Sequence, residues 1–582
     1  MRKPVLLLAF LLGASLACAF ALPAAAGTQT AQAPEKTYAG WAVGDSTDGY
    51  GTILHSTDSG ATWTRQGSAQ DIPDTNFSRA AAIDPLTCWV IGGISNGYGT
   101  ILRTEDGGQT WMRQGSASEI PASEFFKISI VDRNTAWVVG TPAAILFTDD
   151  GGRTWTSKKT SNIPNILLQG VYALDANNVW VTGDIDNGYG TIFRTTDGGA
   201  TWERKGSPSD VPNSALLDVH AVDEDTAWIA SRGSPAPPAT SVLHTDDNGQ
   251  SWIGQDLGTG LLDTNAITTI GDNIVWVATD ADGIYRTDNA KDFVRQAAAH
   301  GAFSYYLIDI QATDANTAWA TGRASYGAGS AAGMIEHTTD GKTWEKQLET
   351  PFGLSGTSFA PIPNFHFAEG TTRPGFEPYF CIQNPGSQEA QVKITYMMGD
   401  GTTKEQELGI VAHSRATINV ASYLGSSDDI AHDFSATVET TNGQAIVAER
   451  PMYFNYNGTW TGGSDVLGAT SPSSIFYFAE GTTRPGFVPY FCIQNPGSQQ
   501  AEVKITYMMG DGSEKEQELA VAPHSRATVN VASYLGSSDD IAHDFSAVVE
   551  STNGEAVVAE RPMYFNYGGA WTGGSDVLGF RP

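Results

Sequence analysis

Cysteine is scarce in this sequence of 582 residues, which has four: Cys18, Cys88, Cys381 and Cys492. Cys18 lies in the N-terminal segment and Cys88 in the first large region. Cys381 and Cys492 occupy equivalent places in a duplicated segment. Since no predicted domain contains a pair of its own, a disulfide scaffold is excluded and buried, unpaired thiols are predicted.

Basic residues are also few: 33 Lys and Arg stand against 64 Asp and Glu, for a formal net charge of −31. So acidic a chain repels phosphate backbones and anionic lipids, which argues against nucleic-acid binding and against polybasic membrane binding. Hydrophobic residues make up 41% and charged residues 17%, with 64 Gly and 27 Pro. This composition predicts a folded, turn-rich protein rather than a disordered one.

Long hydrophobic runs are missing beyond the N-terminus, so no membrane span is predicted. Residues 1–26 have a basic start, an apolar run and an Ala-Ala-Ala cleavage site before Gly27, as in a secretory signal. A lipoprotein acylated at Cys18 is the alternative, although the usual Leu or Val three positions before the cysteine is absent. We expect a secreted or cell-surface protein, with a linker at 27–37.

Amphipathic helical stripes are not found either, whereas tryptophan recurs regularly. Seven tryptophans in short apolar runs are separated by 48, 48, 43, 48, 48 and 43 residues: Trp41, Trp89, Trp137, Trp180, Trp228, Trp276 and Trp319. A period in the forties with short β-rich segments is typical of a propeller or solenoid.

Each period contains four candidate strands, as the second repeat shows at 77–83, 88–92, 100–103 and 110–113. Four antiparallel strands per repeat make a propeller blade. The fold class predicted for residues 38–360 is therefore all-β, a seven-bladed β-propeller.

A Ser/Thr-x-Asp-x-Gly-x-Thr/Ser-Trp motif lies between the third and fourth strands. Asp oxygens can accept backbone N–H bonds in such a turn, and Gly permits positive φ. This is the Asp-box, and we expect its aspartates to be structural rather than catalytic. Five copies are complete, the copy at 287–293 is degraded and the last is one residue short; the motif aspartates are Asp58, Asp106, Asp150, Asp197, Asp247 and Asp340.

The first blade lacks a convincing first strand between Gly27 and Trp41. Phe126 follows Trp111 by 15 residues, and Phe359 follows Trp344 by the same interval. This spacing predicts that residues 356–360 complete the first blade and close the ring with both chain ends, the alternative being a linker.

Residues 365–468 and 476–579 are related by a constant offset of 111, and only 17 of their 104 aligned positions differ. Alternating segments and a Gly-Asp-Gly turn indicate short strands without a helix. Two immunoglobulin-like β-sandwich modules are predicted, at 365–470 and 475–582, although the Cys…Trp…Cys pattern of antibody domains is absent.

The Asp-boxes and the Trp-Val-Val-Gly strands resemble a family of bacterial propellers related to the photosystem II assembly factors. This resemblance implies a seven-bladed fold that binds a protein client and catalyses nothing. The tail modules resemble an immunoglobulin-like domain found in tandem on bacterial surface proteins, which supplies no ligand.

Sialidases carry Asp-boxes too, but no Ile-Pro pair of the propeller follows an arginine here, and seven repeats are present where six are usual. Seven-bladed β-glucan-cleaving enzymes leave no local motif, because they need only two acidic residues across a groove. Asp218 and Asp309 are candidates for such a pair, and ordinary loop carboxylates are the preferred interpretation.

Binding residues are expected on loops opposite the Asp-box turns. Aromatic rings there offer flat contact area for a protein or glycan, whereas packing between blades is the alternative for each ring. The candidates are the tyrosines of four Tyr-Gly turns, Tyr50, Tyr98, Tyr189 and Tyr326, and three residues near inner strands, Arg79, Lys127 and His220.

No catalytic residue, cofactor or metal is predicted, since the sequence has no metal-ligand spacing, phosphate loop or nucleophile elbow. The Asp-rich turns at 184–188 and 280–283 begin like calcium loops but lack the glutamate that completes one. The sequence favours an exported, non-catalytic recognition or adhesion protein that binds an extracytoplasmic protein or glycan, with the tail modules as a stalk. A glycan-cleaving propeller enzyme and an assembly or chaperone-like factor are the alternatives. Ligand and oligomeric state stay open.

Overall fold

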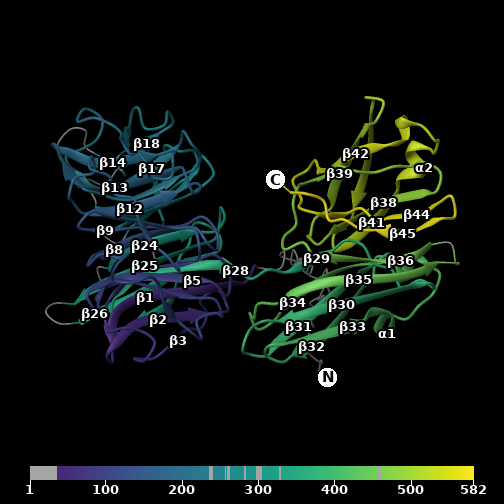
Figure 1. The fold of residues 1–582 in the computed structure, drawn as a ribbon, viewed down its shortest axis with the longest axis horizontal. Helices are drawn as coiled ribbons and strands as arrows, with labels where there is room; N and C mark the ends of the chain where they lie inside the picture. The colour runs from purple at the N-terminus through teal and green to yellow at the C-terminus, as the bar shows by residue number, and fades with distance from the viewer. Residues whose placement is uncertain are drawn as a thin grey trace, which may run out of the picture. The chain divides into compact units, whose positions relative to one another are not determined.

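A computed structural model describes residues 36–581 except 235–239, 256, 258–262, 281–282, 297–304, 327–329, 457 and 459. The predicted signal, Cys18 and most of the predicted linker lie outside the described residues. The described chain is all-β and forms eleven antiparallel sheets, and many of their strands are labelled in Figure 1. None of the helices in the described part is long and apolar enough to cross a membrane.

Seven four-stranded sheets occupy residues 38–361 and have the form of propeller blades. The first strands, in order around the ring, are β28 (Leu354–Pro361), β4 (Phe77–Ala82), β8 (Glu124–Ile130), β12 (Leu168–Ala173), β16 (Leu216–Ala221), β20 (Thr264–Ile270) and β24 (Tyr305–Ala312). Each of these strands contacts the next, and β24 contacts β28, so the ring is closed.

The other strands follow in the same order in each sheet. The second strands are β1 (Tyr38–Thr47), β5 (Cys88–Ser95), β9 (Ala136–Thr141), β13 (Val179–Asp186), β17 (Ala227–Ser234), β21 (Ile274–Thr279) and β25 (Ala318–Tyr326). The third strands are β2 (Tyr50–Ser56), β6 (Tyr98–Thr104), β10 (Ala144–Thr148), β14 (Tyr189–Thr195), β18 (Thr240–Thr245), β22 (Ile284–Thr287) and β26 (Ser330–Thr338). The outermost strands are β3 (Thr64–Arg65), β7 (Met112–Arg113), β11 (Thr156–Ser157), β15 (Glu203–Arg204), β19 (Ile253–Gln255), β23 (Val294–Arg295) and β27 (Glu345–Thr350).

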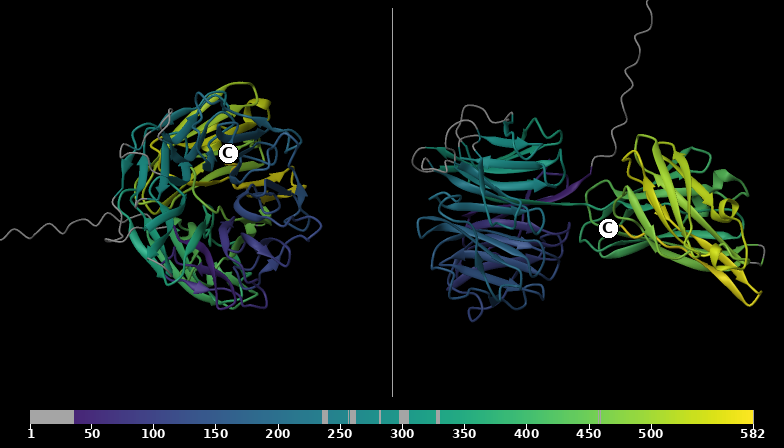
Figure 2. Two further views of the ribbon diagram at one scale, coloured as in Figure 1. Left: turned by 90° about the vertical axis from the view of Figure 1, so that its left-hand side faces the viewer. Right: turned by 90° about the horizontal axis from the view of Figure 1, so that it is seen from above.

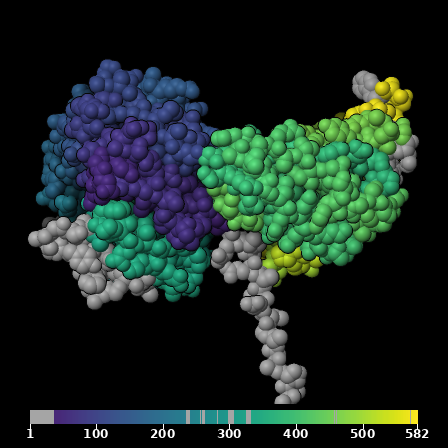
Figure 3. All heavy atoms as spheres, turned by 90° about the horizontal axis from the view of Figure 1, so that it is seen from below, coloured from purple at the N-terminus to yellow at the C-terminus, as the bar shows by residue number. Residues whose placement is uncertain are grey.

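The first sheet combines the two ends of this region, because β28 pairs with β1. Gly40 lies opposite Phe359 and Trp41 opposite Ser358. The purple surface of the first sheet accordingly adjoins teal surface from residues near 300–360 (Figure 3). The prediction that residues 356–360 complete the first blade is confirmed. The predicted outermost strand at 110–113 is shorter than expected, because Thr110 and Trp111 belong to the Asp-box turn.

Tryptophans join neighbouring sheets. The ring of Trp89, on β5, meets that of Trp155, the last residue of the next sheet's Asp-box, edge to face at 5.8 Å between centroids. Trp276 and Trp344 repeat this contact at 5.7 Å. In the degraded copy, Phe293 takes the place of the second tryptophan against Trp228. The two tryptophan series of the sequence are therefore the two halves of one contact between blades.

The tail contains two modules, each with two sheets. In the first module, one sheet has the order β29 (Phe365–Phe367), β34 (Phe434–Thr440), β31 (Ala390–Met398), β32 (Thr403–Ile410), and the other β33 (Ser414–Asn419), β30 (Phe376–Asn384), β35 (Val447–Tyr456), β36 (Trp460–Leu467). In the second, the orders are β37 (Ile475–Phe478), β42 (Phe545–Ser551), β39 (Ala501–Met509), β40 (Glu514–Val521), and β41 (Ser525–Asn530), β38 (Phe487–Asn495), β44 (Met563–Tyr567), β45 (Trp571–Ser575), with β43 (Val558–Glu560) also on β38. Figure 2 shows these strands from two further sides.

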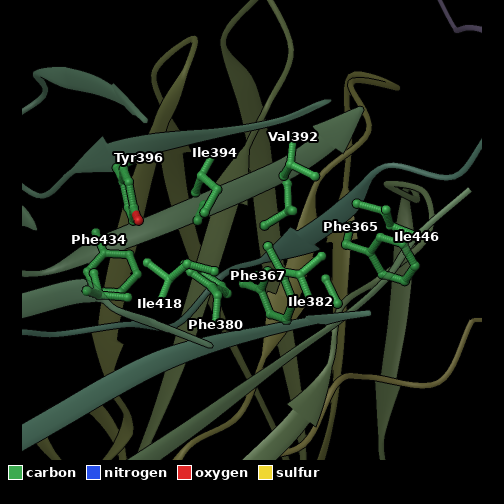
Figure 4. Packing of buried hydrophobic residues seen from close by; sticks show 14 of the residues in the cluster. Phe365, Phe367, Phe380, Ile382, Val392, Ile394, Tyr396, Ile418, Phe434 and Ile446 are labelled. Carbon is green, nitrogen blue, oxygen red and sulfur yellow. The ribbon is translucent and has the colours of Figure 1, made fainter. Parts of the chain in front are cut away.

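Both sheets of a module contribute to a single core. In the first module, Phe367 and Val392 come from one sheet, and Phe380 and Ile382 from the other (Figure 4). Contrary to expectation, each module also contains a short helix, α1 (Val420–Leu424) or α2 (Val531–Leu535). The Asn419 side chain accepts the Ser422 N–H and thereby caps α1.

Candidate functional site

The Asp-box aspartates are engaged within their own turns. Asp58 Oδ1 accepts the Thr62 N–H at 2.8 Å, and its Oδ2 accepts the Thr62 hydroxyl at 2.6 Å. Ser56 Oγ donates to the same carboxylate and accepts the Gly60 N–H. The corresponding turn bonds recur at Asp106, Asp150, Asp197, Asp247 and Asp340.

These bonds favour the ionised carboxylate. At Asp197 the hydroxyl of Thr201, followed by its N–H and the hydroxyl of Thr195, lowers the pKa to about 2. A carboxylate held in this way fixes a turn and is a poor proton donor near neutral pH.

Three of the four candidate tyrosines, Tyr50, Tyr98 and Tyr189, are each covered by an arginine. The Arg65 guanidinium lies 3.8 Å from the centroid of the Tyr50 ring. Arg113 covers Tyr98 at 3.8 Å, and Arg204 covers Tyr189 at 4.1 Å. The Arg65 side chain also donates to the carbonyls of Thr47 and Tyr50, which anchors it to the hairpin. One face of each ring is thus occupied within the blade, while the side chain of Tyr326 lies outside the described part of the structure.

Charged residues meet at the axis of the propeller. The first strands of the seven sheets are the inner strands of the ring. Each places one residue at the position that follows its β-bulge: Arg79, Lys127, Gly170, Asp218, Ala266, Asp309 and Gly356. We call these seven residues the charged tier. It contains two cations on adjacent strands, two carboxylates, one alanine and two glycines.

Within the charged tier every carboxylate oxygen has a partner. Lys127 Nζ lies 2.8 Å from Asp218 Oδ2 and 3.8 Å from Asp309 Oδ1. Arg79 Nε lies 3.6 Å from the same Asp309 oxygen. Backbone N–H groups reach the rest: Val219 donates to Asp218 Oδ1, and Thr357 to Asp309 Oδ2. Asp218 and Asp309 are therefore joined by a shared lysine rather than separated across an open groove.

A second tier, polar at every position except Ala81, lies two residues further along the same strands. It consists of Ala81, Ser129, Tyr172, His220, Thr268, Gln311 and Ser358. Several of its members bond to the next inner strand: Ser129 Oγ accepts the Ala173 N–H, and Ser358 Oγ accepts the Ala82 N–H.

His220 is the one imidazole of the second tier. Its ring packs on Tyr172 at 4.1 Å between centroids, and its Nδ1 shares a hydrogen bond of 2.8 Å with Thr269 Oγ1. Burial, with a smaller contribution from the Lys127 charge, lowers the pKa of His220 to about 3. The imidazole is therefore neutral near pH 7 and adds no charge to the tier.

The two tiers line a cavity of about 230 Å³. Its lining residues belong to the charged tier or follow it along the strands, so the charged tier forms its floor. Each inner strand ends at the same side as the Asp-box turn, as the bond from Gly107 N to Leu86 O shows. The cavity thus lies on the Asp-box side of the charged tier, whereas the sequence favoured the opposite end for binding.

The sequence contains a signal for the charged tier that its residues do not show when each is taken alone. Arg79, Lys127, Asp218 and Asp309 each lie ten residues before a strand tryptophan, as do Gly170 and Ala266. Aligning the repeats on the tryptophans would have placed all six at one level of the ring.

Residues 81–183 and 160–297 match the model of the family described as photosynthesis system II assembly factor YCF48. Residues 81–297 form a YCF48-type propeller segment. No curated protein matches the sequence significantly.

Among solved structures, YCF48 bound to D1 peptide is 20% identical, with 47% of this chain and 82% of that chain covered and a TM-score of 0.34. YCF48 from Cyanidioschyzon merolae is 21% identical, with coverage of 47% and 85% and a TM-score of 0.35. A GH74 xyloglucanase from Xanthomonas campestris is 11% identical, with coverage of 52% and 57% and a TM-score of 0.36. The YCF48-type segment contains Lys127, Asp218 and His220, but Arg79 and Asp309 lie outside it.

Proposed function

We propose that this protein is an exported, non-catalytic binding protein whose propeller holds a segment of another protein at the axial cavity. The match of residues 81–297 to the YCF48 family supports a role in binding or assembly. The structure of a YCF48 protein with a D1 peptide shows that a relative of this fold takes a peptide ligand. The N-terminal pattern at 1–26 supports export. The tail modules, as immunoglobulin-like sandwiches, would serve as the stalk.

The observation that carries the proposal is the charged tier. A hydrolase of the two-carboxylate type needs one acid to donate a proton and a second carboxylate free to attack or to activate water. Here the oxygens of Asp218 and Asp309 are held by Lys127, Arg79 and backbone N–H groups. This arrangement stabilises a ring and closes the floor of a cavity without leaving a free acid–base pair.

The ligand chemistry follows from size and charge. A cavity of about 230 Å³ admits one or two side chains rather than a folded domain. The formal net charge of −31 disfavours strongly acidic partners at long range. A neutral or basic peptide segment that inserts an aromatic or long aliphatic side chain beside Tyr172 fits both conditions.

The test uses a phage-displayed library of random dodecapeptides panned against the full chain. Selected peptides are then measured by calorimetry against the wild type and Ala81→Trp, which fills the cavity without removing a hydrogen-bonding side chain. Ala200→Trp is the matched control, because the equivalent Asp-box position holds Gln109 or Arg153 in other copies.

We expect selected peptides to lose at least tenfold in affinity for Ala81→Trp and to keep their affinity for Ala200→Trp. Equal binding to both variants, or no enriched peptide, would overturn the proposal. A parallel assay for reducing ends released from xyloglucan and bacterial polysaccharides tests the hydrolase alternative. Turnover that disappears in Asp218→Asn would establish catalysis instead.

A further inference from the structure

The two tail modules have nearly the same sequence but different surroundings. Cys492 is 1% exposed, whereas its counterpart Cys381 is partly exposed. Glu369 is 6% exposed, whereas the side chain of its counterpart Glu480 is 61% exposed. The difference arises because an edge of the first module covers a face of the second.

The covering edge consists of Ala368, Glu369 and Gly370, which we call the plug. The N–H groups of Ala368 and Glu369 donate to the two oxygens of Glu560, at 3.1 and 3.0 Å. Ala368 is fully buried against Cys492. The plug is therefore held by a carboxylate that satisfies two adjacent backbone donors.

The side chain of Glu369 is bound in turn by the second module. Cys492 Sγ lies 2.8 Å from Glu369 Oε2, and Arg526 approaches the same oxygen at 3.4 Å. Arg526 also donates to the carbonyls of Gly370 and Phe434 at 3.1 and 3.0 Å. Arg450, beside the plug, contacts Glu560 at 3.1 Å. Charges, backbone groups and shape are thus complementary across this interface.

The receiving face of the second module has an identical copy in the first. The buried side chains are those of Cys492, Gln494, Arg526, Glu560, Tyr564 and Asp576. Their counterparts, each 111 positions earlier, are Cys381, Gln383, Arg415, Glu449, Tyr453 and Asp465. All six residue types are conserved between the copies. In the first module five of the six are exposed and Cys381 is partly exposed. Cys381, Gln383, Arg415 and Glu449 line a hollow of about 600 Å³.

The plug also has an open copy. Its counterparts in the second module are Ala479, Glu480 and Gly481, and Ala479 and Glu480 are exposed. Glu480 Oε2 lies 2.9 Å from Arg561 Nη1, so the arginine that corresponds to Arg450 stands beside the open plug. Each chain therefore presents one open receiving face and one open plug.

We propose that the open plug of one chain, Ala479–Gly481, binds the open receiving face of a second copy, at Cys381, Arg415 and Glu449. In this contact Glu449 accepts the N–H groups of Ala479 and Glu480, and Arg415 binds the Glu480 carboxylate. The two surfaces are different patches of one chain, so the contact is head-to-tail and leaves a plug and a face open at the ends of each assembly. The products are open chains of variable length.

The contact between chains is weaker than its copy within the chain. Within the chain, the short connection between the modules gives the plug a high effective concentration, which two separate chains lack. The net charge of −31 also opposes approach at low salt. Association is therefore expected to rise with protein concentration and with screening salt.

The experiment is sedimentation velocity on the full chain over a concentration series at low and moderate salt. Arg415→Glu reverses the charge that the open receiving face offers to Glu480 and leaves the open plug intact. Ala479→Arg blocks the plug and keeps the face, since the corresponding Ala368 is fully buried in the existing contact. Lys515→Glu and Ala520→Arg, on the exposed strand β40, are the matched controls. Thermal melting checks that each variant is folded.

We expect the wild type and both controls to associate, and each face or plug variant alone to sediment as a monomer. Mixing Arg415→Glu with Ala479→Arg restores one intact plug and one intact face, so a one-to-one complex and no longer species is expected. A wild type that stays monomeric at all concentrations would overturn the proposal, as would variants that associate like the wild type or a mixture without a complex.

Discussion

The ammonium group of Lys127, on β8, lies 2.8 Å from the carboxylate of Asp218, on β16, although 91 residues separate them in the sequence. The carboxylate is 1% exposed, and the lysine is the cation that pairs with it, beside the N–H groups of Val219 and Ile267. Because β8 and β16 belong to the third and fifth blades, the pair ties together strands that are not neighbours in the ring. The charged tier thus links non-adjacent blades across the axis of the propeller.

Replacing Lys127 by methionine is expected to destabilise the propeller by about 3 kcal/mol, because it leaves the Asp218 carboxylate buried without its cation. Lys127→Met/Asp218→Asn should recover part of the loss, since the uncompensated charge is removed as well. Urea unfolding followed by tryptophan fluorescence measures both, because 13 of the 15 tryptophans lie in the propeller. Lys346→Met, which breaks the exposed pair with Glu349, should cost less than about 1 kcal/mol. Equal losses for Lys127→Met and Lys346→Met would contradict this role.

Phe359, on β28 of the first sheet, packs against Trp319 on β25 of the last sheet. Its ring stacks on Trp319 at 3.9 Å and meets Trp63 edge to face at 5.8 Å. Phe359→Ala is therefore expected to cost about 3–5 kcal/mol and to loosen ring closure. Ile253→Ala, at a side chain that is 57% exposed, should stay within about 0.5 kcal/mol of the wild type. Proteolysis within β28 that is no faster in Phe359→Ala than in the wild type would contradict the closure argument.

Much of the propeller could be predicted because its signals are local. Tryptophan spacing gave the repeat, and the Asp-box residues form their turns with bonds that span two to four positions. Closure by 356–360 was predictable from one interval of 15 residues. The short helix α1 was missed because five residues capped by Asn419 carry no amphipathic period.

The candidate site was harder to predict because it depends on register between distant strands. Lys127 and Asp218 were each noticed, but a β-bulge in every inner strand decides that they point to one level of the axis. The contact between the tail modules was invisible for a related reason. Duplicate residues such as Cys381 and Cys492 look alike in sequence, and only the tertiary contact separates them.

The Asp-box carboxylates should make the stability of the propeller fall at low pH. The pKa of Asp197 in the folded protein, about 2, lies below the unfolded value near 4. Its stabilisation is therefore complete above about pH 4 and is lost as the pH falls through about 2. Asp197→Asn should lower the melting temperature at pH 7, and the gap to the wild type should narrow between pH 4 and pH 2. Asp246→Asn, one residue before an Asp-box aspartate, is the control. A gap that does not change with pH would contradict the assignment.

Thiol reactivity should separate the equivalent cysteines of the two modules. Burial, followed by the neighbouring Glu369 charge, raises the pKa of Cys492, and burial also raises that of Cys88. Cys381 is partly exposed and contacts Arg415 at 3.6 Å. In a chain that carries Cys18→Ser, a thiol reagent should therefore modify one cysteine in the native state and three after denaturation. Cys381→Ser should abolish the native reaction.

Glu369→Ala should increase the reactivity of Cys492 at least tenfold, because it opens the plug that covers this thiol. If Cys492 reacted as fast as Cys381 in the chain that carries Cys18→Ser alone, the two tail modules would not contact each other as described.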